Sequence, residues 1–338
     1  MKTLAWIIGT WLALMSSSAW SSIEIEGAGS SLSGSLISNL AQDYQSKHDT
    51  LVSYKPLGSG QGIRLLTGRV NDFALTDVAL SRYETDLLGL VQFPLFFSGI
   101  TPIVNLPGLA PNQLVLDGET LASIFLGDIK RWTDPKIVKL NPQLVIADLP
   151  ITTITRADSS GTSYIFTGYL SNQSQKWRET LGKSSKLTWT TGKSVEGTTQ
   201  VIQAVQGMAG SIGYVEFGAA QRAQVSTVRL QVGDEVKTAS FKGIELASQQ
   251  FTWRQGSLYG ISPANLSGPM WPIVGVTYAL IPKFNSQDLE AKETIAFFDW
   301  LIGHKSSTFE DSLMVPIQDS GLIDQIKKKL YDLNRSKR

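Results

Sequence analysis

At three places along the chain, a short apolar segment typical of a strand is followed by a loop of glycine and serine and then by the start of a helix. The three loops are residues 27–32, 58–62 and 159–163. After the first loop, apolar residues recur every four positions over 32–44, which predicts an amphipathic helix. Strands and helices that alternate in this way favour an α/β architecture.

The alternation continues to the end of the chain. At about 150 residues per domain, the 338 residues are enough for about two domains. Hydrophobic residues make up 42% and charged residues 17%, so the chain is not of the disordered class. Further strands are predicted over 51–54, 73–75, 100–104, 151–155, 211–216 and 273–281, and helices over 63–69, 120–125, 132–140, 163–170, 294–302 and 322–333. Residues 240–270 are predicted as loops and short helices.

The N-terminus has the pattern of a secretory signal peptide. Lys2 is followed by a largely apolar run over residues 4–15 and by small residues at 16–19. We predict a signal peptide over residues 1–22, cleaved between residues 19 and 22. An uncleaved anchor is the alternative, but a membrane span needs about 20 residues and this run is shorter. No later segment approaches about 18 uninterrupted apolar residues, so we expect the exported protein to be soluble.

Composition excludes several kinds of site. The chain has no cysteine, which removes disulfides, thiolate metal sites, cysteine nucleophiles and a lipid-anchor cysteine. His48 and His304 are the two histidines, so a histidine-built metal site or a catalytic triad is not expected. The formal net charge is +1, whereas nucleic-acid binders usually carry a strong basic excess. We therefore predict no bound metal or cofactor and no nucleic-acid partner.

The three loops have the chemistry of an oxyanion site. A helix start exposes backbone N–H groups and carries a partial positive charge, and glycine allows a close approach to the backbone. Serine and threonine hydroxyls add donors without adding charge. A single loop of this kind is more often an ordinary helix cap, but three of them, one preceded by Arg156, favour a site for a tetrahedral anion.

Two aspartates near these loops allow more than one interpretation. Asp158 is predicted as a structural residue, either a helix cap or a partner that holds Arg156. Asp77 closes a buried strand, where it is either a solvated turn residue or an acceptor for a proton carried by the ligand. Phosphate keeps at least one proton near neutral pH and sulfate keeps none, so the second interpretation predicts selection of phosphate.

With these loops, Arg156 and the two aspartates, the chain closely resembles the periplasmic phosphate-binding proteins of phosphate ABC transporters. The resemblance extends over nearly the whole chain after the predicted signal peptide. The residues that carry the resemblance are Gly27-Ala28-Gly29, Gly58-Ser59, Asp77, Gln92-Phe93-Pro94, residues 114–118, residues 121–132 with Leu140-Asn141-Pro142, Arg156-Ala157-Asp158, residues 160–163, residues 213–216, Trp271-Pro272-Ile273 and residues 297–300. Together these motifs are highly specific. The first loop departs from the family pattern at Leu32 and residues 33–35, which bears on affinity more than on the identity of the ligand.

The resemblance implies a fold and a location. The fold is an α/β, two-lobed periplasmic binding protein of type II, with mixed sheets flanked by helices and two crossovers, near residues 97–105 and 271–280. Lobe I would comprise residues 23–100 and 275–338, and lobe II residues 101–274. The implied location is the periplasm, and the implied partners are inorganic phosphate and the membrane permease subunits of a phosphate ABC transporter, with their cytoplasmic ATPase. We expect a monomer.

The resemblance also implies the binding residues. The phosphate-contacting residues would be Ser30, Ser31, Leu32, Ser59, Asp77, Arg156, Ser160, Gly161 and Thr162. Ser30, Ser31 and Leu32 would offer backbone donors, Asp77 would accept the phosphate proton, and Asp158 would hold Arg156.

Two other functions compete with phosphate binding. One is a binding protein for another tetrahedral oxyanion, arsenate or sulfate, and Asp77 argues against sulfate. The other is a secreted phosphate-ester hydrolase, but no Gly-x-Ser-x-Gly nucleophile motif is present. Residues 191–194 imitate the end of a P-loop, yet Leu187 stands where its first glycine is required. We therefore predict a binding protein and not an enzyme.

Overall fold

The computed structural model describes residues 22–254, 258–261, 268–283, 288–304 and 306–335. The predicted signal peptide lies outside the described residues except for Ser22. Within the described ranges, no helix combines the length and the apolar character that a membrane crossing requires.

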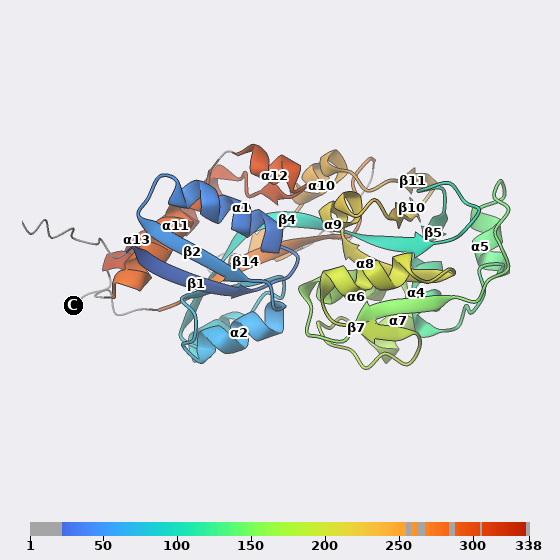
Figure 1. The fold of residues 1–338 in the computed structure, drawn as a ribbon, viewed down its shortest axis with the longest axis horizontal. Helices are drawn as coiled ribbons and strands as arrows, with labels where there is room; N and C mark the ends of the chain where they lie inside the picture. The colour runs from blue at the N-terminus through green and yellow to red at the C-terminus, as the bar shows by residue number, and fades with distance from the viewer. Residues whose placement is uncertain (1–21, 255–257, 262–267, 284–287, 305, 336–338) are drawn as a thin grey trace, which may run out of the picture.

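One mixed β-sheet runs through the molecule, and helices cover it (Figure 1). In spatial order its strands are β2 (Thr50–Lys55), β1 (Ile23–Gly29), β3 (Phe73–Thr76), β14 (Val274–Pro282), β4 (Leu90–Asn105), β8 (Ser211–Glu216), β6 (Thr152–Arg156) and β7 (Lys193–Val195), and β15 (Val315–Pro316) and β9 (Ser226–Thr227) pair with β4. The smaller sheets are formed by β11 (Glu235–Lys237), β10 (Arg229–Val232) and β5 (Val115–Asp117), and by β12 (Thr252–Arg254) and β13 (Tyr259–Ile261).

The helices lie on both faces of the main sheet (Figure 1). They are α1 (Gly34–Gln45), α2 (Ser59–Thr67), α3 (Arg82–Leu87), α4 (Gly118–Leu126), α5 (Pro135–Leu140), α6 (Gly161–Gln173), α7 (Gln175–Thr180), α8 (Gly197–Gln206), α9 (Phe217–Arg222), α10 (Phe241–Ser248), α11 (Leu289–Leu301), α12 (Ser307–Asp311) and α13 (Ser320–Arg335). Figure 1 shows β1, β2, α1 and α2 toward one end of the molecule and α4, α6, α7 and α8 toward the other.

The strand β4 joins the two ends. Its first part pairs antiparallel with β14 up to Gly99, and its second part pairs antiparallel with β8 from Ile100 onward. At this change of partner, the Ile100 N–H donates to the Ile273 carbonyl at 2.8 Å, and the buried Trp271 indole donates to the Ile100 carbonyl at 2.8 Å. Residues 99–100 and 271–274 are therefore the segments that connect the two ends at this point.

Most predicted elements are present, but the structure also contains several that were not predicted, among them α3, α7 and α9. The strand predicted over 100–104 is only the second part of β4, which begins at Leu90. Its first part contains Pro94, and a register shift in the β4–β14 pairing lies beside that proline and opens the regular hydrogen-bond pattern. The helix α8 was not predicted, and residues 240–270, predicted as loops and short helices, also contain the hairpin strands β12 and β13.

Aromatic packing holds the helix α6 against the main sheet. Phe166 of α6 stacks on Tyr214 of β8 with ring centroids 4.2 Å apart, and both side chains are buried. One turn earlier, the Ser163 hydroxyl hydrogen-bonds to the Tyr214 hydroxyl at 2.7 Å. Offset aromatic pairs of this kind add to simple area burial. These contacts hold the first turn of α6 in one orientation against the sheet.

Two glycines let α2 lie directly on β1. A Cβ at Gly62 of α2 would come within 2.4 Å of the Gly29 Cα and 2.7 Å of the Ala28 carbonyl oxygen. Gly29 itself has φ +137°, and a Cβ there would meet the Leu75 carbonyl oxygen at 2.0 Å. The absence of side chains at both positions therefore brings the start of α2 beside the loop that follows β1.

We predict that Gly62→Ala destabilises the protein by about 1–3 kcal/mol, the usual cost of forcing an extra methyl group against rigid backbone. Gly68→Ala at the end of the same helix is the matched control, because its nearest contact would be a carbonyl oxygen at 3.3 Å. Urea unfolding of both variants measures the difference. Equal unfolding free energies for the two variants would contradict the packing argument.

Candidate functional site

The three glycine-serine loops, distant in sequence, meet in the structure. A Cβ at Gly60 would lie 2.5 Å from the Ser159 Oγ, and a Cβ at Gly161 would lie 2.0 Å from the Asp77 Oδ2. The Arg156 guanidinium donates to the Ser31 Oγ at 3.2 Å. The three loops and Asp77 therefore lie in contact with one another, with no room for side chains at Gly60 and Gly161.

Arg156 supplies a buried positive charge at the end of β6. Its residue surface is 2% exposed, and its guanidinium makes a fork-like pair with the Asp158 carboxylate, with Nε to Oδ1 at 2.7 Å and a second bond from Nη2 to Oδ2. The backbone N–H of Gly197 also donates to Asp158 at 3.2 Å. The prediction that Asp158 pairs with Arg156 therefore agrees with the contacts in the structure.

The pair holds Asp158 in its ionised form. Burial alone would raise the pKa of the Asp158 carboxyl, but the hydrogen bond and charge of Arg156 and the Gly197 N–H outweigh it, and the pKa is lowered. A fixed, ionised Asp158 keeps the Arg156 guanidinium in one plane. The remaining N–H groups of that guanidinium can then meet an anion without rearrangement.

Asp77 is buried and is surrounded by hydroxyl donors. It is 4% exposed, and its carboxylate accepts hydrogen bonds from Ser30 Oγ at 2.6 Å, from Ser59 Oγ at 3.3 Å and from Thr277 Oγ1 at 2.5 Å. Burial raises the pKa of the Asp77 carboxyl, and the three hydroxyl donors and the charge of Arg156 oppose that shift. The solvated turn suggested as one interpretation of Asp77 does not agree with this burial.

Thr277 was not among the predicted site residues. It lies in β14, and the register shift in the pairing of β14 with β4 falls between Thr277 and Tyr278. Such irregularities re-aim a side chain, and here the Thr277 hydroxyl reaches the Asp77 Oδ1. The surrounding sequence is a run of apolar strand residues, so no local signal distinguishes this threonine from a core residue.

The start of α6 presents polar groups beside Asp77. Ser160 caps the helix, with its Oγ accepting from the Ser163 N–H at 3.3 Å. Gly161 and Thr162 follow as the first helical residues, a position whose N–H groups have no partner within the helix. The Thr162 Oγ1 is buried and has no hydrogen-bond partner among the described residues. An anion at this helix start would supply the missing partner.

In the loop after β1, Ser30 does not offer the group that was expected of it. Ser30 was expected to offer its backbone N–H to a ligand, but that N–H donates to the Leu75 carbonyl at 2.8 Å. Ser30 acts on Asp77 through its hydroxyl, and its own carbonyl accepts from Tyr54 at 2.9 Å. Ser31 and the buried Leu32 follow it, and the Ser31 hydroxyl faces Arg156.

Taken together, these groups fit a protonated tetrahedral oxyanion. Arg156, the α6 start and the serine and threonine hydroxyls are donors, whereas Asp77 is an acceptor for a ligand proton. Among the described residues, no group of three or more His, Asp or Glu side chains is arranged to hold a metal ion.

We predict that Thr277→Val lowers the free energy of unfolding by about 2 kcal/mol at pH 8, the scale of a hydrogen bond to a charged group. Loss of this donor raises the pKa of Asp77 further above its unfolded value. A raised carboxyl pKa means that stability is lost as pH rises through it, so the variant should be affected less at pH 5 than at pH 8.

Thr101→Val is the control, because the buried Thr101 hydroxyl donates only to the neutral Pro102 carbonyl, at 3.3 Å. Its cost should not change with pH. Chemical unfolding at several pH values gives both curves, and a pH-independent cost for Thr277→Val would show that the bond does not act on an ionised Asp77.

Comparisons with known proteins agree on one family. The model of the PBP superfamily domain matches residues 16–305. The phosphate-binding protein PstS of Haemophilus influenzae is 34% identical over 297 residues, covering 86% of this chain and 89% of that protein. The PstS protein of Xylella fastidiosa is 33% identical over 309 residues, covering 90% of this chain and 84% of that protein.

Solved structures agree on the fold. A high-affinity periplasmic phosphate-binding protein, solved with bound phosphate, superposes with a TM-score of 0.73 at 17% identity, covering 90% of this chain and 93% of that one. A phosphate-binding protein from Stenotrophomonas maltophilia gives a TM-score of 0.67 at 19% identity, with the same coverage. The predicted two-lobed α/β fold with a mixed sheet is confirmed. By its sequence and its fold, the chain belongs to the PBP superfamily, and within it to the family of PstS phosphate-binding proteins.

Proposed function

We propose that this protein binds inorganic phosphate in the periplasm and delivers it to an ABC-type phosphate importer. One observation carries the proposal: a buried, paired arginine lies close enough for its charge to act on a buried aspartate, and this aspartate lies against the start of α6. A site with both groups can hold an anion and also accept a proton from it, which is what a partly protonated phosphate requires.

Each side chain then has a role toward phosphate. Arg156 pairs with two phosphate oxygens, and Asp158 fixes its orientation. The N–H groups of Gly161 and Thr162, together with the Thr162 hydroxyl, bind at the helix start. The hydroxyls of Ser31 and Ser59 and the backbone N–H of Leu32 complete the donor set, with the Ser160 hydroxyl near them. Asp77 accepts the phosphate proton, and Ser30 and Thr277 orient its carboxylate.

Calorimetric titration tests the binding. We expect one phosphate per chain without added metal, and Arg156→Ala should weaken it by more than about 100-fold, because it removes the charged donor. Arg131→Ala is the control, since Arg131 forms an exposed ion pair with Asp148. Circular dichroism establishes that each variant is folded. No phosphate uptake by the folded wild type, or equal affinities for both variants, would refute the proposal.

Asp77 should set the choice between phosphate and sulfate. An ionised Asp77 facing a fully deprotonated anion brings two acceptors and two negative charges together in a buried site. Asp77→Asn replaces this contact with an amide that can donate. We predict that the variant binds sulfate about 10- to 100-fold more tightly than the wild type, the scale of relieving one unpaired polar contact.

The pH dependence of sulfate binding gives the control for Asp77. Because burial raises the pKa of Asp77, this carboxyl gains its proton early as pH falls and can then donate to sulfate. Wild-type affinity for sulfate should therefore increase toward acid pH, whereas the affinity of the Asn variant should change little. Competition of sulfate with labelled phosphate measures both, and a variant that rejects sulfate as strongly as the wild type does would make Asp77 purely structural.

The division into lobes is part of the proposal. Residues 23–100 with 275–338 would form lobe I, and residues 101–274 lobe II. The change of strand partner between Gly99 and Ile100 supports a boundary there. Asp77 then belongs to lobe I and Arg156 to lobe II. Phosphate would favour the closed arrangement because neither lobe alone surrounds it.

The relatives also support the remaining assignments. They are named as binding proteins and not as enzymes, and we propose that this chain likewise has no catalytic activity. Arsenate has the same shape and protonation chemistry as phosphate and should compete with it, whereas sulfate should not. We further propose export by a cleaved signal peptide, action as a monomer, and a partner formed by the membrane permease subunits of the importer.

A further inference from the structure

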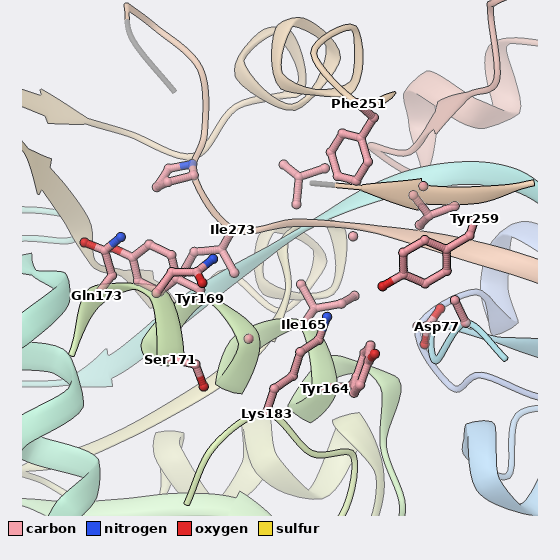
Figure 2. A pocket seen from close by; sticks show the side chains of 18 of the residues that line it. Asp77, Tyr164, Ile165, Tyr169, Ser171, Gln173, Lys183, Phe251, Tyr259 and Ile273 are labelled. Atoms are coloured by element: carbon pink, nitrogen blue, oxygen red, sulfur yellow. The ribbon is translucent and has the colours of Figure 1, made fainter. Parts of the chain in front are cut away.

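A second cavity lies beside Asp77, and we call it the α6 cavity (Figure 2). Its volume is about 550 Å³. It follows α6 from Tyr164 to Gln173, and residues 272–276 and Tyr259 of β13 form other parts of its wall. Figure 2 shows Asp77 at one end and Gln173 at the other.

The α6 cavity is distinct from the proposed phosphate site. Among the described residues, Asp77 is the one member of the phosphate site that also lines the cavity. At the start of α6, the Gly161 backbone lies so close to the Asp77 carboxylate that a Cβ would be 2.0 Å from its Oδ2. Arg156 and residues 160–162 do not line the cavity, so a molecule in it would lie beside Asp77 and away from the proposed phosphate position.

Aromatic rings and the exposed lysine Lys183 line the cavity. Tyr164, Tyr259 and Phe251 line it, and the Lys183 Nζ lies 4.0 Å from the centroid of the Tyr164 ring. Lys183 reaches this position across Gly168, where a Cβ would come within 3.0 Å of the Lys183 Cε. Figure 2 shows Lys183, Tyr164 and Tyr259 around the same space. Such walls suit a flat ring with a negative group.

The charges along the wall favour an anion. Lys183 and Arg178 line the cavity, and the Arg178 Nε is held by the Ser171 carbonyl at 2.8 Å. Among the described lining residues, Asp77 is the acidic one, and its carboxylate already accepts hydrogen bonds from three hydroxyls. A carboxylate beside Lys183 would therefore meet a cation, whereas Asp77 lies at one end of the cavity (Figure 2).

We propose that the α6 cavity is a second binding site, and that its ligand is a small aromatic carboxylate. The ring would lie against Tyr164 and Tyr259, and its carboxylate would pair with Lys183. This proposal does not depend on phosphate binding, because the α6 cavity shares only Asp77 with the phosphate site.

The experiment uses 4-hydroxybenzoate as the probe, in ligand-observed NMR and calorimetric titrations of the full-length protein. 4-Hydroxybenzyl alcohol, which has the same ring and hydroxyl but no charge, is the ligand control. We expect Lys183→Met to weaken 4-hydroxybenzoate binding about fivefold or more, the upper range for a partly solvated ion pair. Lys186→Met is the matched control, because this lysine lies in the same loop and is exposed as Lys183 is, but it does not line the cavity.

Phosphate separates this site from the first one. 4-Hydroxybenzoate should still bind at saturating phosphate, and the phosphate affinity of Lys183→Met should equal that of the wild type. No binding of the probe at millimolar concentration would overturn the proposal. So would equal binding of 4-hydroxybenzoate and its alcohol, equal affinities of Lys183→Met and Lys186→Met, or displacement of the probe by phosphate.

Discussion

The rest of the site depends on one buried carboxylate that three separate segments must satisfy. Asp77 follows β3 and receives hydroxyl bonds from Ser30 after β1, from Ser59 at the start of α2 and from Thr277 in β14. A buried carboxylate without such partners would be strongly destabilising. Because its partners come from distant parts of the chain, satisfying Asp77 also fixes the relative positions of the loop, the helix and the strand that surround the site.

The positive charge of Arg156, on the other side of the site, is also held in place by neighbouring groups. Arg156 is buried and is oriented by Asp158, which in turn is held by a backbone N–H at the start of α8. The donor and the acceptor are therefore each held in one orientation by neighbouring groups. Rigid, complementary groups lower the ordering cost of binding and make a wrongly protonated anion a poor fit.

Much of this arrangement was predictable because its signals are local. Glycine and serine at a strand end predict an anion-binding helix start, and Arg156 with Asp158 two residues later predicts a paired charge. The role of Thr277 was not predictable, because it depends on a register shift between β14 and β4, two strands that lie far apart in the sequence. The backbone N–H of Ser30 was expected to bind the ligand, but it donates to the Leu75 carbonyl. This is a tertiary contact, which the local sequence does not indicate. The early start of β4 was missed because Pro94 reads locally as a strand breaker.

The most direct measurement of the central claim is a high-resolution crystal structure of the protein with phosphate, at a pH where phosphate keeps one proton. We expect one phosphate ion held between Arg156 and the start of α6, with one oxygen about 2.5–2.7 Å from an Asp77 carboxylate oxygen, the distance of a hydrogen bond to a charged acceptor. A phosphate ion bound elsewhere, or one separated from Asp77 by water, would contradict it.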